Sequence, residues 1–575
     1  MFSKYGGDEM GKILRVNMTT KEITCSEVRD YDFLGGRALS SRIIYDEVEA
    51  NCEPLGKKNK LVIATGLLSG TVASSASRVS IGSKSPLTNG IKEANSGGVS
   101  GAKLSRCGYQ AIIVEGKSGE GSNVLVIDKE GARLENCPEL ELLGNYDTTD
   151  KIYSKLGEKV GILCIGPAGE RGLRGASIAS NDPHKELKFA ARGGLGAVMG
   201  SKGLKAIVID DEGCDMVAYK DKDKFTAIAK DFNKKLAADP KTKNIYHNYG
   251  TAGIVKAVNS MGALPTNNFR YGSFEHVDNL SGEKLNELIK ARGGEGKLAV
   301  SCMDVCAIRC STVYPDENGK KIVSTLQYEN IALLGSNLGL DNLDAVARLN
   351  YEINDLGLDT IETGCALGVA LDQGYGEFGN EKDCMALIKE IWRNTPLGRI
   401  IGNGAQVTGQ ILGSNRIPAA KGQGFAGYDP RALKGNGVTY SMSPMGADHT
   451  AGNCFGARKT VDPLGTDKQG ELSKQLQIQI GTLDCIGLCM FARGPLFADP
   501  NILAEIVNTK AGSNFNKDTI WNLAVDTIKL ERQFNINAGL SPANDKLPEY
   551  LYEEELSPTN AVFDLSEEEM KKSII

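Results

Sequence analysis

The hydrophobic pattern of the chain changes near residue 211, and this change restricts the possible folds more than any other feature. Before it, short apolar runs separated by glycines predict strands at 13–16, 61–64, 111–114, 124–127, 161–165 and 206–209. After it, apolar residues recur at helical spacing, and the run from Leu343 to Leu356 ends at Gly357. Similar runs predict helices around 384–392, 472–480 and 520–534. We therefore expect an α+β fold in which most strands precede the helices.

The length of the chain requires several domains. At 575 residues it exceeds the roughly 250 to 300 residues beyond which a single hydrophobic core stops growing. Gly, Ser, Asn and Pro cluster between Gly413 and Pro418, which predicts a boundary within the helical part. We expect a β-rich domain over 1–211 and two helical domains over 212–415 and 416–575, without an internal repeat of fixed period.

Composition and charge argue against several classes of function. Hydrophobic residues make up 41% and charged residues 24% of the chain, as in soluble globular proteins. The net charge is −6 and no run of Lys or Arg is interleaved with aromatic residues, so we expect no nucleic-acid partner. No stretch approaches about 18 apolar residues, and the start from Met1 to Gly11 is polar and glycine-rich, unlike a signal peptide. We therefore expect a cytoplasmic protein without a membrane partner.

The fourteen cysteines are expected to be reduced thiols, because no export signal is present. Cys302, Cys306 and Cys310 follow one another at four-residue spacing, and Cys489, close to Cys485, would complete a four-thiolate set. An iron–sulfur cluster and a structural zinc are both held in this way, and spacing alone favours neither. The nine scattered cysteines are expected to be small buried hydrophobic residues: Cys25, Cys52, Cys107, Cys137, Cys164, Cys214, Cys365, Cys384 and Cys454.

Four glycine clusters in the first 211 residues suggest a polyanionic ligand. They lie at 35–37, 95–98, 166–170 and 192–196, and Arg37 and Arg192 stand within two of them. Glycine lets backbone N–H groups approach an anion closely, and arginine offers a bidentate fork to a phosphate. A tight turn is the simpler explanation for any one cluster alone, and none fits a Rossmann or P-loop pattern.

Two later segments share a shape, and one histidine stands apart. In both 354–359 and 484–489 a polar residue is followed, after two residues, by Gly-Leu, as if two loops held two copies of one chemical group. Histidine is rare, and His449 lies in a stretch rich in Gly, Ser and Asn. It is a candidate for catalysis, although a lone histidine is more often a structural group.

Ordered motifs along nearly the whole chain resemble the tungsten-containing aldehyde:ferredoxin oxidoreductases. The resemblance implies a β-rich N-terminal domain that cradles pterins, followed by two mainly helical domains, and it favours an iron–sulfur cluster over zinc. The segments that carry it are 11–17, 83–98, 108–116, 192–202, Ile165-Gly166-Pro167-Ala168-Gly169-Glu170 and Leu356-Gly357-Leu358-Asp359-Thr360.

The resemblance also implies roles for particular residues. Glu329 and His449 resemble two polar groups beside a tungsten centre, with molybdenum as the alternative metal. The metal is held by two pyranopterins and by no protein ligand. A [4Fe–4S] cluster is implied on Cys302, Cys306, Cys310 and Cys489. Contacts to the pterin phosphates and their Mg²⁺ are implied for Arg78, Asn95, Gly97, Arg192, Gly193, Gly194 and Gly196. The pterins themselves are implied to be held by Asn354, Leu358, Asp359, Asp484 and Leu488.

The implied reaction is the oxidation of an aldehyde with water to a carboxylic acid, which releases two electrons and two protons. Glu329 would accept a proton, and His449 would donate a hydrogen bond to the carbonyl oxygen. The cluster would pass electrons to ferredoxin or to iron–sulfur or flavin subunits. The alternatives are the tungsten subunit of a benzoyl-CoA-reductase-type or electron-bifurcating complex, and a catalytically idle electron-transfer or scaffold subunit.

Three features depart from the family pattern. The local cysteines are separated by three and three residues, with Ala307 after Cys306, where two and three residues and often a proline are usual. Asn354 stands where an aspartate is usual. Arg348 and Tyr351 occupy the positions of a Glu-x-x-His pair that bridges subunits through a metal, so we do not expect that homodimer.

Overall fold

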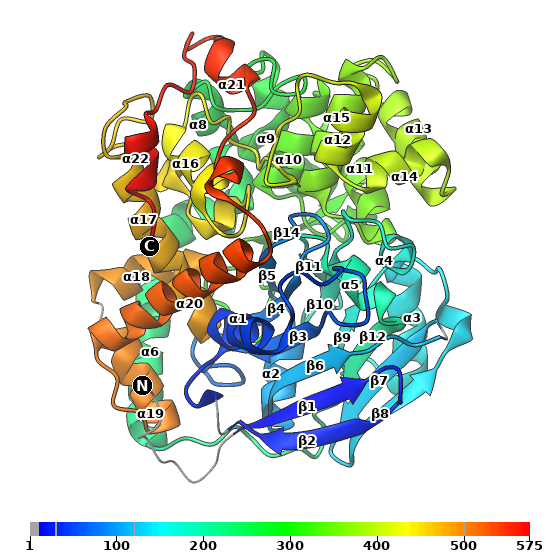
Figure 1. Cartoon of the computed structure of the whole chain (residues 1–575), viewed down its shortest axis with the longest axis vertical. Coiled ribbons are helices and arrows are strands. Elements are labelled where there is room, and N and C mark those ends of the chain that lie inside the picture. The colour runs from blue at the N-terminus through cyan, green and yellow to red at the C-terminus, as the bar shows by residue number, and fades with distance from the viewer. Residues whose placement is uncertain (1–10, 29–30, 120, 500) are drawn as a thin grey trace.

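The computed structural model describes residues 11–28, 31–119, 121–499 and 501–575 (Figure 1). The first ten residues, on which most of the signal-peptide argument depends, lie outside this part. Strands dominate up to residue 209 and helices dominate after it, so the predicted α+β class is confirmed. In Figure 1 the large sheets occupy the lower half of the molecule, and many of the later helices lie above them.

The first sheet contains six strands. Its elements are β1 Lys12–Asn17, β2 Ile23–Glu27, α1 Gly36–Glu47, β3 Leu61–Thr65, β4 Val79–Lys84, β5 Ile91–Ser96, α2 Ser100–Arg106 and β6 Tyr109–Glu115. The strand order is β2-β1-β6-β3-β4-β5. β1 and β6 are parallel, and the other neighbouring pairs are antiparallel.

The second sheet also contains six strands. Its elements are β7 Asn123–Asp128, β8 Gly131–Asn136, α3 Asn145–Leu156, β9 Gly161–Cys164, α4 Pro167–Glu170, β10 Ile178–Asn181, β11 Leu187–Ala190, α5 Leu195–Ser201 and β12 Leu204–Ile209. The strand order is β11-β10-β9-β12-β7-β8, with β12 and β7 parallel.

The two sheets share one topology. The order β8-β7-β12-β9-β10-β11 matches the first sheet strand for strand, including its one parallel pair. Helices α1 and α3 follow the second strand of each unit, and α2 and α5 precede the sixth. The units span 12–115 and 123–209, so the repeat has different lengths in its two copies. This is why the sequence, in which we expected no repeat of fixed period, does not reveal it.

The central strands of both sheets are buried on both faces, which explains their apolar runs, whereas the residues of the edge strands β2 and β8 are exposed or half-buried. Along β3, Leu61 and Ile63 belong to a core formed by the two sheets together, whereas Val62 and Ala64 pack with α1. In β9, Leu163 belongs to the core shared with the first sheet, whereas Ile162 and Cys164 pack with α3. Successive side chains of a strand point to opposite faces, so a strand covered on both sides needs apolar residues throughout.

The four helices predicted by apolar periodicity are present as α11, α13, α17 and α20. The main elements after residue 211 are α6 Lys222–Ala238, α8 Val255–Ser260, α9 Gly282–Arg292, β13 Lys297–Val300, β14 Ser311–Pro315, β15 Lys321–Val323, α10 Tyr328–Leu334, α11 Leu343–Leu356, α12 Thr360–Asp372, α13 Glu381–Trp392, α14 Pro396–Gly402, α15 Ala405–Leu412, β16 Ala419–Ala420, β17 Gln423–Gly424, α16 Lys434–Met442, α17 Gln469–Ile486, α18 Arg493–Ala498, α19 Asn501–Ala511, α20 Lys517–Asn537, α21 Tyr550–Glu553 and α22 Glu567–Lys571.

One hydrophobic cluster extends across the predicted boundary near residue 415. It joins Leu333 and Leu367 with Phe425, Tyr440 and Leu565. The helices on the two sides of the boundary therefore share a core, and the three domain ranges stay predictions.

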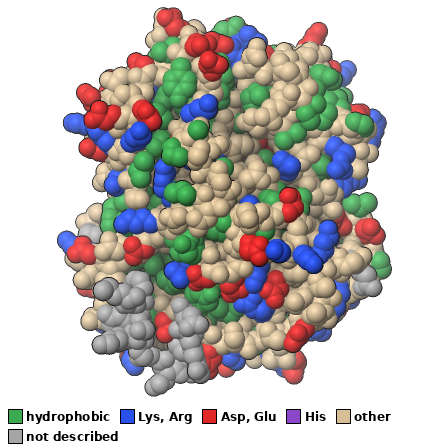
Figure 2. All heavy atoms as spheres, viewed as in Figure 1, with side chains coloured by type: hydrophobic (Ala, Val, Ile, Leu, Met, Phe, Trp, Pro, Cys, Tyr) green, Lys and Arg blue, Asp and Glu red, His purple; other side chains and the backbone are tan. Residues whose placement is uncertain are grey.

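No single helix of the described part is long and apolar enough to cross a membrane. The sharply bent pair formed by α17 and residues 490–498 meets that criterion only when its two members are taken together. On the face shown in Figure 2, acidic and basic side chains are intermingled.

Candidate functional site

The two segments predicted to bind pterins end their helices in the same way. Gly357 follows α11 with φ 77°, and Gly487 follows α17 with φ 83°, both in the left-handed region. Leu358 N donates to Ile353 O at 3.0 Å, and Leu488 N donates to Leu483 O at 2.9 Å. These are the contacts of a Schellman cap, in which glycine is favoured because it has no Cβ.

Each of these loops packs against the end of a corresponding strand. A Cβ on Gly166, just beyond β9, would lie 2.4 Å from Leu356 O. A Cβ on Gly66, just beyond β3, would lie 2.1 Å from Ile486 O. β3 and β9 hold the same place in the two sheets. The two predicted pterin loops therefore occupy equivalent positions on a two-fold repeated base.

Three of the predicted ligand-binding residues meet at the loop that contains Gly487, namely Arg78, Asn95 and Asp484. Arg78 donates to Asn95 O at 2.9 Å, and Asn95 Nδ2 donates to Asp484 Oδ1 at 3.2 Å. The guanidinium of Arg37 lies 3.5 Å from Asp484 Oδ2. Burial raises the pKa of Asp484 to about 6 and that of neighbouring Glu93 to about 8, although Arg37 opposes both shifts.

Arg192 and Asp359 meet near the loop that contains Gly357. Arg192 NH1 donates to Asp359 Oδ2 at 2.8 Å, and NH2 donates to Ala447 O at 2.6 Å. Both side chains are buried, as is Leu358 beside Asp359. Arg192 thus links the first 211 residues to two segments of the helical part. The contact of Arg192 with a pterin phosphate stays a prediction.

The predicted glycines are sites of close backbone packing. A Cβ on Gly97 would lie 2.9 Å from Cys302 Sγ, and one on Gly196 would lie 2.2 Å from Ser177 O. Gly193 and Gly194 have φ values of 88° and 74°, which side chains rarely tolerate. A Cβ on Gly193 would also lie 2.3 Å from Cγ of Lys92. These glycines are therefore required by packing, whether or not they contact a ligand.

Asn354 is buried, and its side chain forms a hydrogen bond with Tyr146. Tyr146 stacks on Tyr351, with ring centroids 4.7 Å apart. Arg348 forms a bidentate ion pair with Glu381 at 2.6 and 2.8 Å. The two positions where the family's subunit bridge would need ligands are thus engaged within the chain. The absence of a metal-bridged homodimer stays a prediction.

Glu329 and His449, the two predicted catalytic residues, face each other. His449 Nε2 lies 3.4 Å from Glu329 Oε1, and the side chains are only 15% and 12% exposed. Glu329 stands in the first turn of α10 and accepts a hydrogen bond from Gly427 N at 2.7 Å through Oε2. Among the described residues, Glu329 Oε1 and His449 Nδ1 have no hydrogen-bond partner. Burial raises the pKa of Glu329 more than His449 and the Gly427 N–H lower it.

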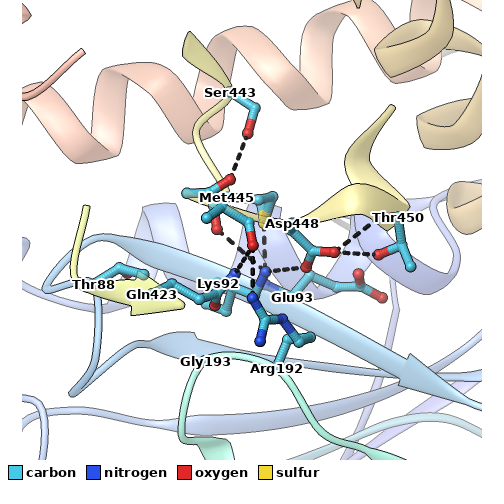
Figure 3. Close-up of polar contacts among 12 residues, drawn as sticks. Thr88, Lys92, Glu93, Arg192, Gly193, Gln423, Ser443, Met445, Asp448 and Thr450 are labelled. Carbon is cyan, nitrogen blue, oxygen red and sulfur yellow. Dashed lines mark hydrogen bonds and ion pairs between the residues drawn. The ribbon is translucent and has the colours of Figure 1, made fainter. Parts of the chain in front are cut away.

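A buried ion pair supports the loop that carries His449 (Figure 3). Lys92 of β5 is fully buried; its Nζ lies 2.5 Å from Asp448 Oδ2 and donates to Met445 O at 3.2 Å. Asp448 Oδ1 accepts from Thr450 N at 2.9 Å and from Thr450 Oγ1 at 2.7 Å. Burial by itself would raise the pKa of Asp448, but the charges of Lys92 and Arg192 outweigh it and hold that pKa well below its usual range.

Asp448 is therefore a buried, paired carboxylate and is poorly suited to exchanging protons with a substrate. Sequence reasoning missed Lys92, because only its contact with Asp448, 356 residues along the chain, distinguishes it from other lysines.

The four predicted cluster cysteines come together from two distant segments. Gly98 N donates to Cys302 O at 2.8 Å, and Cys489 N donates to Ser75 O at 2.9 Å. The four thiols affect one another's ionisation. A hydrogen bond from Cys302 lowers the pKa of Cys306 to about 6, although burial opposes this. Cys302 thus lies near the other three thiols, and its role as a cluster ligand stays a prediction. The Cys485 thiol instead lies 3.8 Å from Thr527 Oγ1.

These thiols do not form a site for one small ion. Within the described part of the chain, no three His, Cys, Asp or Glu side chains are grouped closely enough to hold a single metal ion. Four thiolates around one zinc would have to converge at about 2.3 Å from a common point. The choice of an iron–sulfur cluster over zinc stays a prediction.

The scattered cysteines follow the prediction in six of nine positions. Cys52, Cys137, Cys164, Cys365, Cys384 and Cys454 are buried. Cys25 is exposed, and Cys107 and Cys214 are partly exposed, with their sulfurs 3.3 Å apart. The prediction of burial was wrong for these three, because the edge strand β2 carries Cys25, the end of α2 carries Cys107 and a loop near the surface carries Cys214.

Comparison with known proteins agrees with this architecture. The family model described as aldehyde ferredoxin oxidoreductase, N-terminal domain, matches residues 13–211. The model described as domains 2 and 3 of the same family matches residues 227–573. The tungsten-containing aldehyde ferredoxin oxidoreductases of Pyrococcus furiosus and Thermococcus kodakarensis are each 32% identical to this chain, covering 95% of it and 91% of their own length.

Two further proteins are more distant. The WOR-like subunit of an aliphatic sulfonate oxidoreductase from Pyrococcus furiosus is 28% identical, covering 91% of this chain and 85% of its own. The active-site complex BamBC of benzoyl coenzyme A reductase contains a chain with a TM-score of 0.80 and 20% identity, covering 98% of this chain and 93% of that one, a likeness of fold alone. The two family models together span nearly the whole chain, so this protein belongs to the aldehyde ferredoxin oxidoreductase family of oxidoreductases.

Proposed function

We propose that this protein oxidises aldehydes to carboxylic acids at a tungsten bis-pyranopterin centre in the cytoplasm. Electrons would leave through a [4Fe–4S] cluster to ferredoxin or to an electron-transfer subunit. The observation that carries the proposal is the buried pair of Glu329 and His449, 3.4 Å apart. The charges of Arg192 and Asp359, near the loop that contains Gly357, also affect the pKa of Glu329.

The residues around this pair fit a large polar cofactor built from two similar halves. Two equivalent loops on two equivalent sheets suit a ligand that contains two copies of one group. In the described part of the chain, buried polar atoms without a hydrogen-bond partner occur at and beside β10 and on Arg192, namely Ser177 Oγ, Ser180 Oγ and Arg192 Nε. Because buried polar groups are normally hydrogen-bonded, these atoms favour a polar ligand. Arg78, Asn95 and the 192–196 turn would hold its phosphates with Mg²⁺, while the 354–359 and 484–488 loops would hold its rings.

The metal centre, when bound, would supply the two-electron redox couple of the reaction. The chain's own contribution is proton handling. Glu329, whose raised pKa makes it a stronger base than an ordinary carboxylate, would accept a proton from water or hydrated aldehyde. His449 Nε2 lies towards the Glu329 carboxylate, so in the imidazolium form the second proton, on Nδ1, can form a hydrogen bond to the aldehyde oxygen as negative charge develops there.

An iron–sulfur cluster fits the four thiols better than zinc does. Cys302, Cys306, Cys310 and Cys489 are mutual neighbours but do not converge on a single ion. A [4Fe–4S] cluster takes one thiolate at each of four separated irons. Arg78, whose backbone N–H donates to Gly487 O, also influences the pKa of Cys489, so this arginine lies between the thiols and the second Gly-Leu loop.

Metal analysis combined with an aldehyde-dependent dye-reduction assay tests the proposal. We expect about one tungsten and four irons per chain and reduction of a viologen dye by aldehydes. A preparation that oxidises aldehydes but contains neither tungsten nor molybdenum would contradict the proposed centre. Zinc in place of iron would contradict the proposed cluster.

A further inference from the structure

The cysteine-bearing loops reach the surface at one apolar spot. Ser75 N donates to Val305 O at 2.6 Å, which joins the loop before Cys306 to the segment that also holds Cys489. Next to this junction, Val72 is 47% exposed and Val305 is 38% exposed. Cys306, the residue after Val305, is itself only partly covered. The proposed cluster would therefore lie directly beneath exposed valine side chains.

Helix α6 borders this spot and is firmly attached to it. Asn233 Nδ2 donates to Val72 O at 3.0 Å, and its Oδ1 accepts from Ser74 N at 2.7 Å. The apolar face of α6 shares a hydrophobic cluster with Cys310 and Cys489. The position of α6 relative to the four cysteines is thus determined by packing and by hydrogen bonds.

The outer side of α6 is positively charged, although the whole chain is acidic. Helix α6 and the five residues after it, 222–243, contain seven lysines and three aspartates, while the net charge of the chain is −6. All seven lysines are exposed. At about 100° per residue, Lys222 and Lys230 lie within roughly 60° of Asn233 around the helix, on the side of Val72. Lys224 and Lys235 lie roughly 160° or more from Asn233, on the opposite flank.

We propose that Val72, Val305 and the Lys222–Lys230 flank of α6 form the docking surface for an acidic iron–sulfur protein that receives the electrons. This inference rests on the proposed function. The lysines attract a partner of opposite charge and speed its association. The small apolar centre excludes water at the point of contact. A contact of this size suits a partner that must leave after each electron transfer, since transient redox complexes bury less than about 1,200 Å².

The test compares two charge-reversal variants of the purified holoenzyme on the same helix. K222E/K230E alters the proposed flank, and K224E/K235E makes the same change in charge on the opposite flank. An acidic ferredoxin serves as the large acceptor and methyl viologen as the small one. For K222E/K230E we expect the KM for ferredoxin to rise at least about 10-fold at low salt, with viologen reduction unchanged. For K224E/K235E we expect less than about a 3-fold change.

Direct titration with ferredoxin measures binding without turnover, so it separates this inference from the proposed function. A selective loss of ferredoxin affinity in K222E/K230E would support the docking surface even if the wild type showed no aldehyde oxidation. Equal effects of the two variants, or unchanged affinity in K222E/K230E, would overturn it. Self-association of the wild type that K222E/K230E abolishes would also overturn it, because the face would then be an interface between copies of the chain.

Discussion

Replacing Lys92 with Met should destabilise the protein strongly and displace His449. Methionine keeps most of the aliphatic stem that packs against Gly193 but removes the charge 2.5 Å from Asp448 Oδ2. Lys92 and Asp448 are 0% and 3% exposed, so the carboxylate would be left buried with the charge of Arg192 as its main remaining stabilisation. Breaking such a buried pair costs about 3 to 5 kcal/mol. If a unit of roughly 200 residues unfolds together, the melting temperature should fall by about 6 to 20 °C.

The loss should depend on pH in a defined direction. In the wild type the pKa of Asp448 is held below its unfolded value of about 3.9. Its contribution to stability is therefore complete above that pH and is lost as the pH falls through the folded value. Without Lys92 the pKa of Asp448 rises, and its protonation relieves the buried charge. The deficit of Lys92→Met should thus be larger at pH 8 than at pH 5.

Scanning calorimetry at both pH values, with the single and double variants of Lys92→Met and Asp448→Asn, provides the measurement. The double variant should lose much less stability than the sum of the two single variants, because the ion pair is removed as a unit. Additive losses, or a melting temperature for Lys92→Met within about 2 °C of the wild type at both pH values, would refute the reasoning.

Four further predictions concern the chemistry and the assembly. Glu329→Gln and His449→Asn should each lower kcat by a factor of about 10² to 10⁴ with metal content unchanged. Near-normal aldehyde oxidation by both variants would mean that other groups transfer the proton. Because the pKa of Glu329 is raised, the acid limb of the wild-type kcat/KM profile should lie above the usual carboxylate range, a limb that Glu329→Gln should lose. Cys489→Ser should lose the cluster's electron paramagnetic resonance signal and iron, whereas the neighbouring Cys485→Ser should retain both, and equal iron loss would contradict the assignment. Chelators should leave the oligomeric state unchanged in sedimentation, and a dimer that dissociates on metal removal would show that a bridging metal exists.

Local patterns predicted much of the fold because local physics produces it. The apolar periodicity of α11 and the glycine at 357 are properties of one short segment, and the helix ends there as expected. The central strands of the first 211 residues were recognisable because both of their faces are buried, which leaves nearly continuous apolar runs. The duplicated topology was not visible, since strand order depends on pairing between distant segments and the two units differ in length.

By itself, the sequence determined which residues can carry the chemistry, since three closely spaced cysteines, two Gly-Leu loops and a rare histidine are visible without coordinates. Only the tertiary structure decided how they combine. It brings Cys489 to Cys302, places Glu329 against His449, and pairs Asp448 with Lys92 so that Asp448 is unavailable for proton transfer. The physical reason is that ion pairing and desolvation depend on distance and burial in space, and residues hundreds of positions apart acquire both only when the chain has folded.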